Sequence, residues 1–199
     1  MEALSALLTR ASVPAKKMTD PGPDDATIDT LLRAAVTAPD HGGLRPWRFI
    51  LIRGAARRAF GELMADAYAL RHADADPEMI QRQRDKPLRS PALLVVAARL
   101  SADNPKVPEI EQLLSAGAAI QNILIAAHAL GWGAVWYTGD AAYDWNVAEP
   151  LGLGMDERIV GFIYLGTPPA TRPAKERPDP SEFLREWSGP QERTTDSEI

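Results

Sequence analysis

The stretch QLLSAGAAIQNILIAAHALGWGAVWYTG, residues 112–139, carries no formal charge over its whole length. It is long enough to cross a bilayer. However, Gln121, Asn122, His128 and four glycines interrupt it, and neither end has a basic flank. We therefore predict a helix over 109–130 that is buried on nearly all sides and ends at Gly131. Such a helix needs a large protein or a second subunit to cover it.

The other elements are predicted from hydrophobic periodicity and from turn residues. Strand 91–100 is an apolar run of the kind that is buried on both faces of a sheet, and Asp24 or Asp25 can cap the second helix. The order of helices and strands predicts a sandwich of α and β layers around one sheet. The remaining segments are helices 3–8, 26–36 and 55–70, an exposed helix or lid near 79–86, a helical turn at 145–149, and strands 47–52, 134–137 and 157–165.

The acidic composition argues against nucleic acid as the main partner, because phosphate binding needs a basic face and the 199 residues carry a net charge of -5. The chain has no cysteine, which excludes disulfides and thiolate ligands. No basic segment precedes the apolar residues of the N-terminus, so it does not resemble a signal peptide. We expect a cytoplasmic protein without a membrane partner. It should form one domain over residues 1–187, followed by a disordered tail over 188–199.

The usual catalytic motifs are missing. Gly131-Trp132-Gly133 and Gly152-Leu153-Gly154 lack the third glycine of a dinucleotide-binding loop, and no P-loop occurs. The three histidines share no metal-ligand spacing, and there is no G-x-S-x-G nucleophile elbow. Any catalysis is therefore expected to belong to a bound organic cofactor.

Several separated segments occur in a recognisable order. They are Arg10-Ala11-Ser12 after the first helix, APDHGGLRPWRF (38–49) after the second, SAGAAIQN (115–122) in the long helix, GWGAVW (131–136) beyond it, VGFIYLGTP (160–168) and KERP (175–178). In this order and spacing the chain resembles the FMN-dependent nitroreductase family over residues 1 to about 185. It is most similar to the small bacterial NAD(P)H nitroreductases whose loop reads A-P-D-H.

The resemblance implies an α+β fold, with a central, mostly antiparallel sheet flanked by helices. It also implies a homodimer with the long helix at the subunit interface and two FMN sites along that interface. The implied activity is hydride transfer from NADH or NADPH through the flavin to a nitroaromatic, a quinone or a similar small electron acceptor. The flavin carries the chemistry, so no catalytic side chain and no metal are expected.

The resemblance places the FMN phosphate at Arg10, Ala11 and Ser12, with Lys175 and Arg177 arriving from the C-terminal segment. A guanidinium matches a phosphate in charge and in geometry. Simpler roles remain open: Arg10 can be a solvated charge at a helix end, Ser12 a turn residue, and the two C-terminal cations part of a charged tail.

The loop after the second helix supplies the next predicted contacts. The resemblance implies that Thr37, Pro39 and His41 come from the opposite subunit and border the flavin. A broken helix end exposes hydrogen-bonding groups that a regular helix would not offer. As an alternative, His41 is an ordinary solvent-facing loop residue. Trp47 begins a strand and is assigned to the core.

The resemblance also places Trp136, Tyr137 and Thr138 against the isoalloxazine ring. Backbone N–H groups there can stabilise negative charge on the reduced ring near N5. A strand that ends in a glycine turn explains the same segment without a ligand.

The sequence departs from the family pattern at several positions. Ala11 stands where many members have a second basic residue, and Gly43 and Arg45 stand where many have Asn and Gln. Pro14 replaces a lysine that would stabilise negative charge at the flavin N1–O2 edge. Lys16 or Lys17 is a candidate substitute.

Two other readings stay open. One keeps the flavin but changes the reaction to that of a dehydrogenase or of a reductive dehalogenase of a metabolite. The other is a dimer that binds flavin without turnover.

Overall fold

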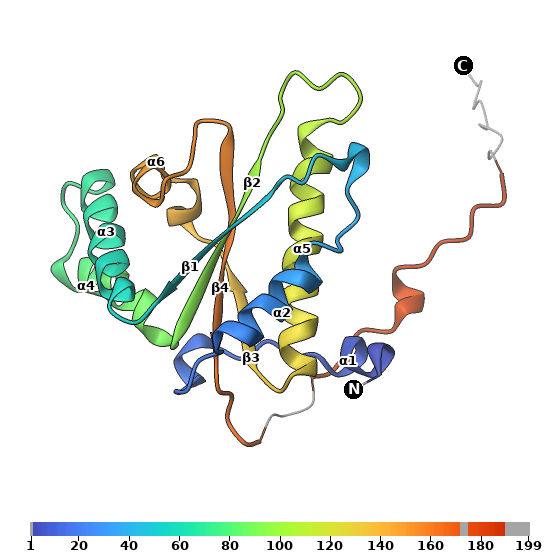
Figure 1. Ribbon diagram of the computed structural model, residues 1–199, viewed down its shortest axis with the longest axis horizontal. Helices are drawn as coiled ribbons and strands as arrows, with labels where there is room; N and C mark the ends of the chain where they lie inside the picture. The colour runs from blue at the N-terminus through green and yellow to red at the C-terminus, as the bar shows by residue number, and fades with distance from the viewer. Residues whose placement is uncertain (1, 172–174, 190–199) are drawn as a thin grey trace, which may run out of the picture.

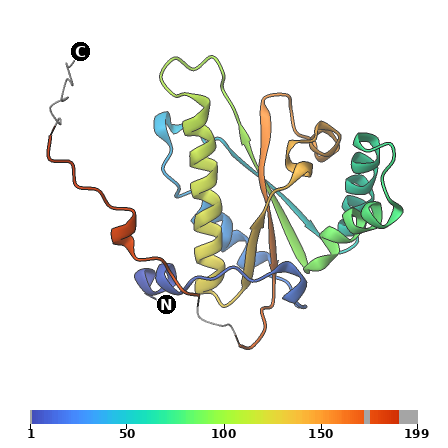
Figure 2. The ribbon, with the colours of Figure 1, turned by 180° about the vertical axis from the view of Figure 1, so that it is seen from behind.

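The computed structural model describes residues 2–171 and 175–189 and has the predicted α+β architecture (Figure 1). One sheet lies between two groups of helices, and the reverse view shows the same three layers (Figure 2). The strands are β1 (Trp47–Arg53), β2 (Ala92–Arg99), β3 (Gly133–Tyr137) and β4 (Glu157–Gly166). The α-helices are α1 (Ala3–Thr9), α2 (Asp25–Ala35), α3 (Ala56–Arg71), α4 (Pro77–Asp85), α5 (Glu109–Ala129) and α6 (Trp145–Ala148). The short 3-10 helices are η1 (Ala15–Lys17), η2 (His41–Gly43), η3 (Lys86–Arg89), η4 (Asp140–Tyr143), η5 (Glu149–Leu151) and η6 (Pro180–Glu182).

The four strands pair in the order β1-β2-β4-β3, and every pairing in the described residues is antiparallel. Strand β2 is central and buried along its length, as its apolar run predicts, with only Arg99 exposed. Strand β3 pairs with only one half of β4, from Phe162 to Gly166. The other half of β4 therefore has an outer edge without a strand partner among the residues described.

Alternation along the strands creates two cores. Leu93 and Val95 on β2 and Phe162 on β4 pack with Phe60 and Met64 of α3. Leu94 and Val96 of β2 and Ile163 of β4 point to the other face, where α2 and α5 cover them. Because successive strand residues face opposite sides, one sheet serves both helical layers.

Helix α2 begins where the sequence predicts. The Asp24 carboxylate accepts a hydrogen bond from the Thr27 N–H at 2.8 Å, so Asp24 rather than Asp25 is the N-cap. This bond, together with the backbone bonds that the carboxylate accepts, holds the pKa of Asp24 below its usual value.

The segment predicted as an exposed helix or lid folds as α4 and is fixed on α3. A Cβ added at Gly61 of α3 would collide with the Arg84 carbonyl oxygen of α4, so only glycine permits this approach. Arg84 also pairs with Glu62 of α3 at 2.7 Å.

Helix α5 departs from its prediction. Among the described residues it is the one helix long and apolar enough to cross a bilayer by length and composition. Eight of its residues are buried, as in a core helix, yet Ile110 and Leu114 are 60% and 65% exposed. The prediction of burial on nearly all sides is thus wrong for a single chain, because the sheet and α2 cover only one side of the helix.

The C-terminal segment leaves the body of the molecule beside α1 and extends away from it (Figures 1 and 2). Its large apolar side chains, Phe183, Leu184 and Trp187, are all more than 70% exposed. The predicted disorder over 188–199 falls mostly outside the described residues.

Candidate functional site

One group of predicted site residues surrounds Arg10, directly after α1. Its guanidinium Nη1 lies 3.4 Å from the Ser12 hydroxyl oxygen. Its main-chain carbonyl accepts a hydrogen bond from the Arg177 guanidinium. Ala11 lies between Arg10 and Ser12 in the sequence and is half-buried. The exposed Lys175 precedes Arg177 by two residues.

The charge of this group is poorly neutralised. Burial lowers the pKa of Arg10, and repulsion from Arg177 lowers it further. In residues 2–171 and 175–189 no carboxylate forms an ion pair with either guanidinium. A bound anion would relieve both effects, since two guanidinium groups and a hydroxyl can donate to phosphate oxygens. The residues present therefore fit the phosphate of an FMN molecule.

The start of β3 lies next to the segment that carries this group. The Val13 N–H donates to the Ala134 carbonyl at 3.0 Å, so the segment that carries Arg10 and Ser12 runs beside β3. Trp136, Tyr137 and Thr138 follow along the strand and are all exposed.

Two contacts fix the aromatic residues of β3. The Trp136 indole Nε1 donates to the Val160 carbonyl at 3.3 Å and lies over Gly161, where any Cβ would collide with it. The Tyr137 ring meets Tyr164 edge-on, with 5.4 Å between ring centroids. Gly139 then adopts φ 82° and turns the chain away from the strand. The end of β3 is thus a rigid, exposed surface, on the strand whose start lies beside the segment that carries Arg10.

Thr37 and His41 form a second group after α2. The Thr37 hydroxyl donates to the Ala34 carbonyl at 2.8 Å and accepts from the Asn122 amide at 3.2 Å. His41 Nδ1 lies 2.6 Å from Glu111 Oε2 in the first turn of α5. Both side chains therefore already have partners within the chain, and the sequence did not indicate either partner.

The segment after α1 and the 3-10 helix η2, which carries His41, lie toward opposite ends of α5 (Figure 1), whereas Thr37 bonds to Asn122 between them. Thr9, next to Arg10, bonds to His128 near the C-terminal end of α5 at 2.9 Å, whereas His41 pairs with Glu111. Glu111 and His128 are seventeen residues apart, which is about 25 Å of helix. One chain therefore does not bring His41 to Arg10.

Sequence reasoning missed Lys86. The 3-10 helix η3 that carries it packs against η1, which follows the Arg10–Ser12 segment. Burial lowers the pKa of Lys86, as do Arg89 and Arg71, while Asp140 raises it. Asp140 comes two residues after Thr138, so a half-buried ammonium lies close to the turn that ends β3. The available signal was its position directly before Pro87, in the short segment that leads into the buried strand β2.

A cavity of about 660 Å³ lies elsewhere. It borders the free edge of β4, with Leu113, Trp145, Met155 and Val160 among its walls. None of the predicted site residues lines it. The Arg10 group is therefore separate from this cavity.

Comparison with known proteins identifies the family. The protein-family model described as "Nitroreductase family" matches residues 7–167, which is most of the chain. The chain belongs to the nitroreductase family. The Escherichia coli K12 protein named "Putative NAD(P)H nitroreductase YdjA" is 35% identical over 185 residues, a match that covers 92% of this chain and 98% of the relative.

Solved structures of nitroreductase-like proteins have the same fold. A nitroreductase-like family protein from Bacillus cereus superposes with a TM-score of 0.80 at 25% identity, covering 95% of this chain and 97% of the other. A Desulfovibrio desulfuricans protein described as a "putative nitroreductase in complex with fmn" gives a TM-score of 0.70 at 26% identity, covering 96% and 99%. The predicted family and fold class are confirmed.

Proposed function

We propose that this nitroreductase family member is an FMN-dependent oxidoreductase that passes hydride from NADH or NADPH to a small electron acceptor, such as a nitroaromatic or a quinone. The observation that carries the proposal is the partly desolvated guanidinium of Arg10, which has that of Arg177 beside it and lies on the segment next to the start of β3. The names of its relatives, NAD(P)H nitroreductases and an FMN complex, confirm this class of activity.

The phosphate of FMN would be held by Arg10, Ser12 and Arg177. Lys175 can reach the same anion, because it is exposed on the segment that brings Arg177 to Arg10. Ala11 contributes main chain only. These residues bind and orient, and the cofactor supplies the two-electron chemistry.

The ring of the cofactor would lie along Trp136, Tyr137 and Thr138. Pro14 stands where the family pattern has a lysine. Lys86 is the best candidate for the missing positive charge, since its half-buried ammonium interacts with Asp140, shortly after this strand end, and η3 packs against η1. Lys16 and Lys17, the substitutes that the sequence offered, are both exposed. A cation at the N1–O2 edge would favour the reduced ring.

The active form would be a homodimer. An exposed stripe along α5, with Ile110, Leu114 and the partly exposed Gly117 and Ile125, gives a surface that a second copy can cover. The exposed apolar residues of the C-terminal segment need cover as well. A second copy would also bring its Thr37 and His41 to the flavin site, and one chain does not bring His41 there. We place the enzyme in the cytoplasm.

An anaerobic titration tests the function. The purified protein should be yellow, and NADH or NADPH should bleach the flavin band near 450 nm. Adding a quinone or a nitroaromatic under argon should then restore the band. Bound flavin that neither nicotinamide reduces would overturn the proposal in favour of a different flavin reaction or a binding protein. A colourless protein that takes up no added FMN would overturn it entirely.

A further inference from the structure

His41 and Glu111 form a close contact that the proposed function does not yet use. His41 belongs to η2, after α2, and Glu111 lies in the first turn of α5, seventy residues later. The His41 Nδ1 and the Glu111 Oε2 are 2.6 Å apart, and both side chains remain partly exposed. A carboxylate can only accept at such a contact, so Nδ1 carries a proton whether the ring is neutral or charged.

The backbone around His41 is fixed independently of Glu111. The Asp40 carboxylate accepts hydrogen bonds from the N–H groups of Leu44 at 3.2 Å and Arg45 at 2.7 Å. Gly42 has φ 75°, and a Cβ there would lie 3.1 Å from the Val107 side chain. The loop conformation therefore depends on Asp40 and Gly42.

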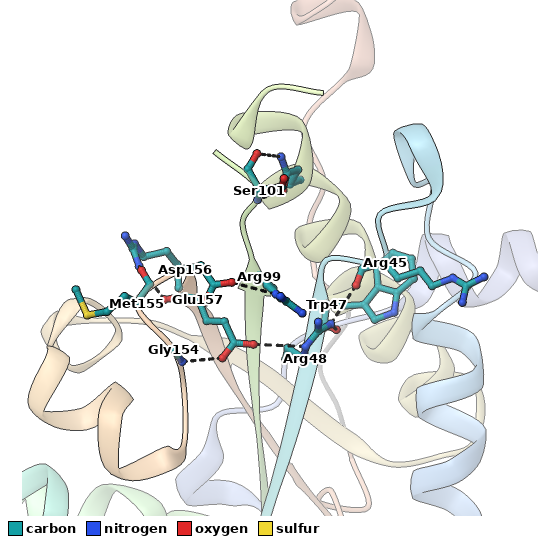
Figure 3. Close-up of polar contacts among 11 residues, drawn as sticks. Arg45, Trp47, Arg48, Arg99, Ser101, Gly154, Met155, Asp156 and Glu157 are labelled. Carbon is teal, nitrogen blue, oxygen red and sulfur yellow. Dashed lines mark hydrogen bonds and ion pairs between the residues drawn. The ribbon is translucent and has the colours of Figure 1, made fainter. Parts of the chain in front are cut away.

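The far end of the same loop is anchored to the sheet. Arg48 of β1 donates to the Arg45 carbonyl at 3.1 Å and pairs with Glu157 of β4 at 3.4 Å (Figure 3). With the backbone held at both ends, rotation of the imidazole ring is the main freedom left to His41. Glu111 removes that freedom.

The pair opens onto a small pocket of about 350 Å³ on the exposed side of α5. Pro39, Leu114 and Ala118 give it apolar walls, and His41, Glu111 and Ser115 give it polar ones. The Ser115 hydroxyl, one turn beyond Glu111, is buried and has no hydrogen-bond partner among the described residues. Buried hydroxyls without a partner are rare in proteins, so this pocket has unused capacity to bind a polar group.

We propose that Glu111 is the positioning residue for His41: it engages Nδ1 and so leaves Nε2 as the ring nitrogen that the loop offers to the flavin site of a second copy. This inference rests on the proposed function, because the flavin site supplies the ligand that Nε2 meets. The role is one of orientation, and Glu111 itself touches neither substrate nor flavin.

Nitrogen-15 NMR of the FMN-loaded protein tests the orientation directly. The chain has three histidines, so the His41 signals can be assigned by comparison with His41→Gln. In the wild type, Nδ1 should carry the proton of the neutral ring. In Glu111→Ala, a large share of that proton should move to Nε2. A tautomer that is the same in both proteins would overturn the proposal, and this result does not depend on turnover.

Steady-state kinetics with NADPH and menadione test the consequence. Glu111→Ala should lower kcat by about 10–100-fold, the scale expected for a misplaced active-site group. Its FMN content and its KM for NADPH should stay within about twofold of the wild type. Glu111→Gln, whose amide oxygen can still accept from Nδ1, should recover most of the rate. Glu109→Gln removes an exposed glutamate from the same helix turn and should match the wild type.

The choice of nitrogen gives a further check. The amide of glutamine reaches about as far as Nε2, and that of asparagine about as far as Nδ1, so His41→Gln should retain more activity than His41→Asn. Glu111→Ala added to His41→Gln should cost little more, because the two residues act as one unit. If the loss of kcat in the double variant were the full sum of the two single losses, in free-energy terms, the proposal would be overturned. A protein that binds no FMN would instead overturn the proposed function, and with it the link between His41 and flavin.

Discussion

The guanidinium of Arg177 donates a hydrogen bond to the main-chain oxygen of Arg10, which joins the C-terminal segment to the end of α1. This contact gathers two cations around one point of the surface without a neutralising carboxylate in the described residues. The charge of this site, and with it the choice of an anionic cofactor, follows from that geometry.

Arg10→Ala should weaken FMN binding by about 10–100-fold, since a hydrogen bond to a charged group contributes about 1.5–3 kcal/mol. Arg10→Lys should recover only part of the loss, because an ammonium does not make the paired contacts of a guanidinium. Fluorescence titration of the apo-protein measures both. The exposed Arg58 is the control, and Arg58→Ala should bind FMN like the wild type. Unchanged affinity in Arg10→Ala would remove Arg10 from the site.

Leu114→Glu should convert the proposed dimer to a monomer and release FMN at the same time. The substitution puts a charge into the apolar stripe of α5, where Leu114 is 65% exposed in a single chain. Light scattering coupled to gel filtration gives the mass, and absorbance gives the flavin. Leu70→Glu is the matched control, since Leu70 is 73% exposed but lies on α3. A wild-type protein that runs as a monomer with full flavin would refute the shared site.

Gly161→Ala should lower the free energy of unfolding by about 1–3 kcal/mol, because the new methyl group would overlap the Trp136 indole. In a Trp136→Ala background the same substitution should cost much less. Gly117→Ala is a useful contrast, because its Cβ would lie 3.9 Å from the same indole and alanine favours a helix. Urea unfolding measures the free energy of unfolding of each variant. An unchanged value in Gly161→Ala would mean that the Trp136 indole packs elsewhere.

The free energy of unfolding should fall at alkaline pH, and part of this fall should come from ionisation of Tyr164. Burial raises the pKa of Tyr164 to about 12, with Tyr137 adding to the effect and Arg89 opposing it. A folded pKa above the unfolded value of about 10 stabilises the fold below pH 10, and this contribution is lost as the pH rises toward 12. Between pH 9 and 11.5 the wild type should lose about 1–2 kcal/mol relative to Tyr164→Phe. Tyr143→Phe, at an exposed tyrosine, should change nothing. Parallel pH profiles for the wild type and Tyr164→Phe would contradict the expectation.

Local pattern was enough to predict most of the fold. The unbroken apolar run of β2 and the cap at Asp24 each depend on residues close in sequence, so the structure confirms them to within a residue or two. The packing of α4 was not predictable, because it depends on Gly61 meeting a carbonyl of Arg84. The burial of α5 was overestimated, since composition shows that a helix needs cover and not whether the cover is in the same chain.

The site was harder to predict, because its contacts join distant segments. The sequence offered Arg10, Ser12 and Arg177 through a family resemblance, but the bond between the first and the last spans 167 residues. The pairing of His41 with Glu111 leaves no local signature either. Lys86 was overlooked because a charged stretch ordinarily indicates solvent exposure, whereas this lysine is half-buried.

Calorimetric titration of the apo-protein with FMN and with riboflavin is the most direct test of the phosphate site. The two ligands share the ring and differ only in the phosphate. FMN should bind at least about 100-fold more tightly, consistent with two charged hydrogen bonds. Arg177→Ala should remove most of that difference, while Arg185→Ala, at an exposed arginine of the same segment, should preserve it. Equal affinities for FMN and riboflavin in the wild type would contradict the assignment of Arg10, Ser12 and Arg177 as a phosphate-binding site.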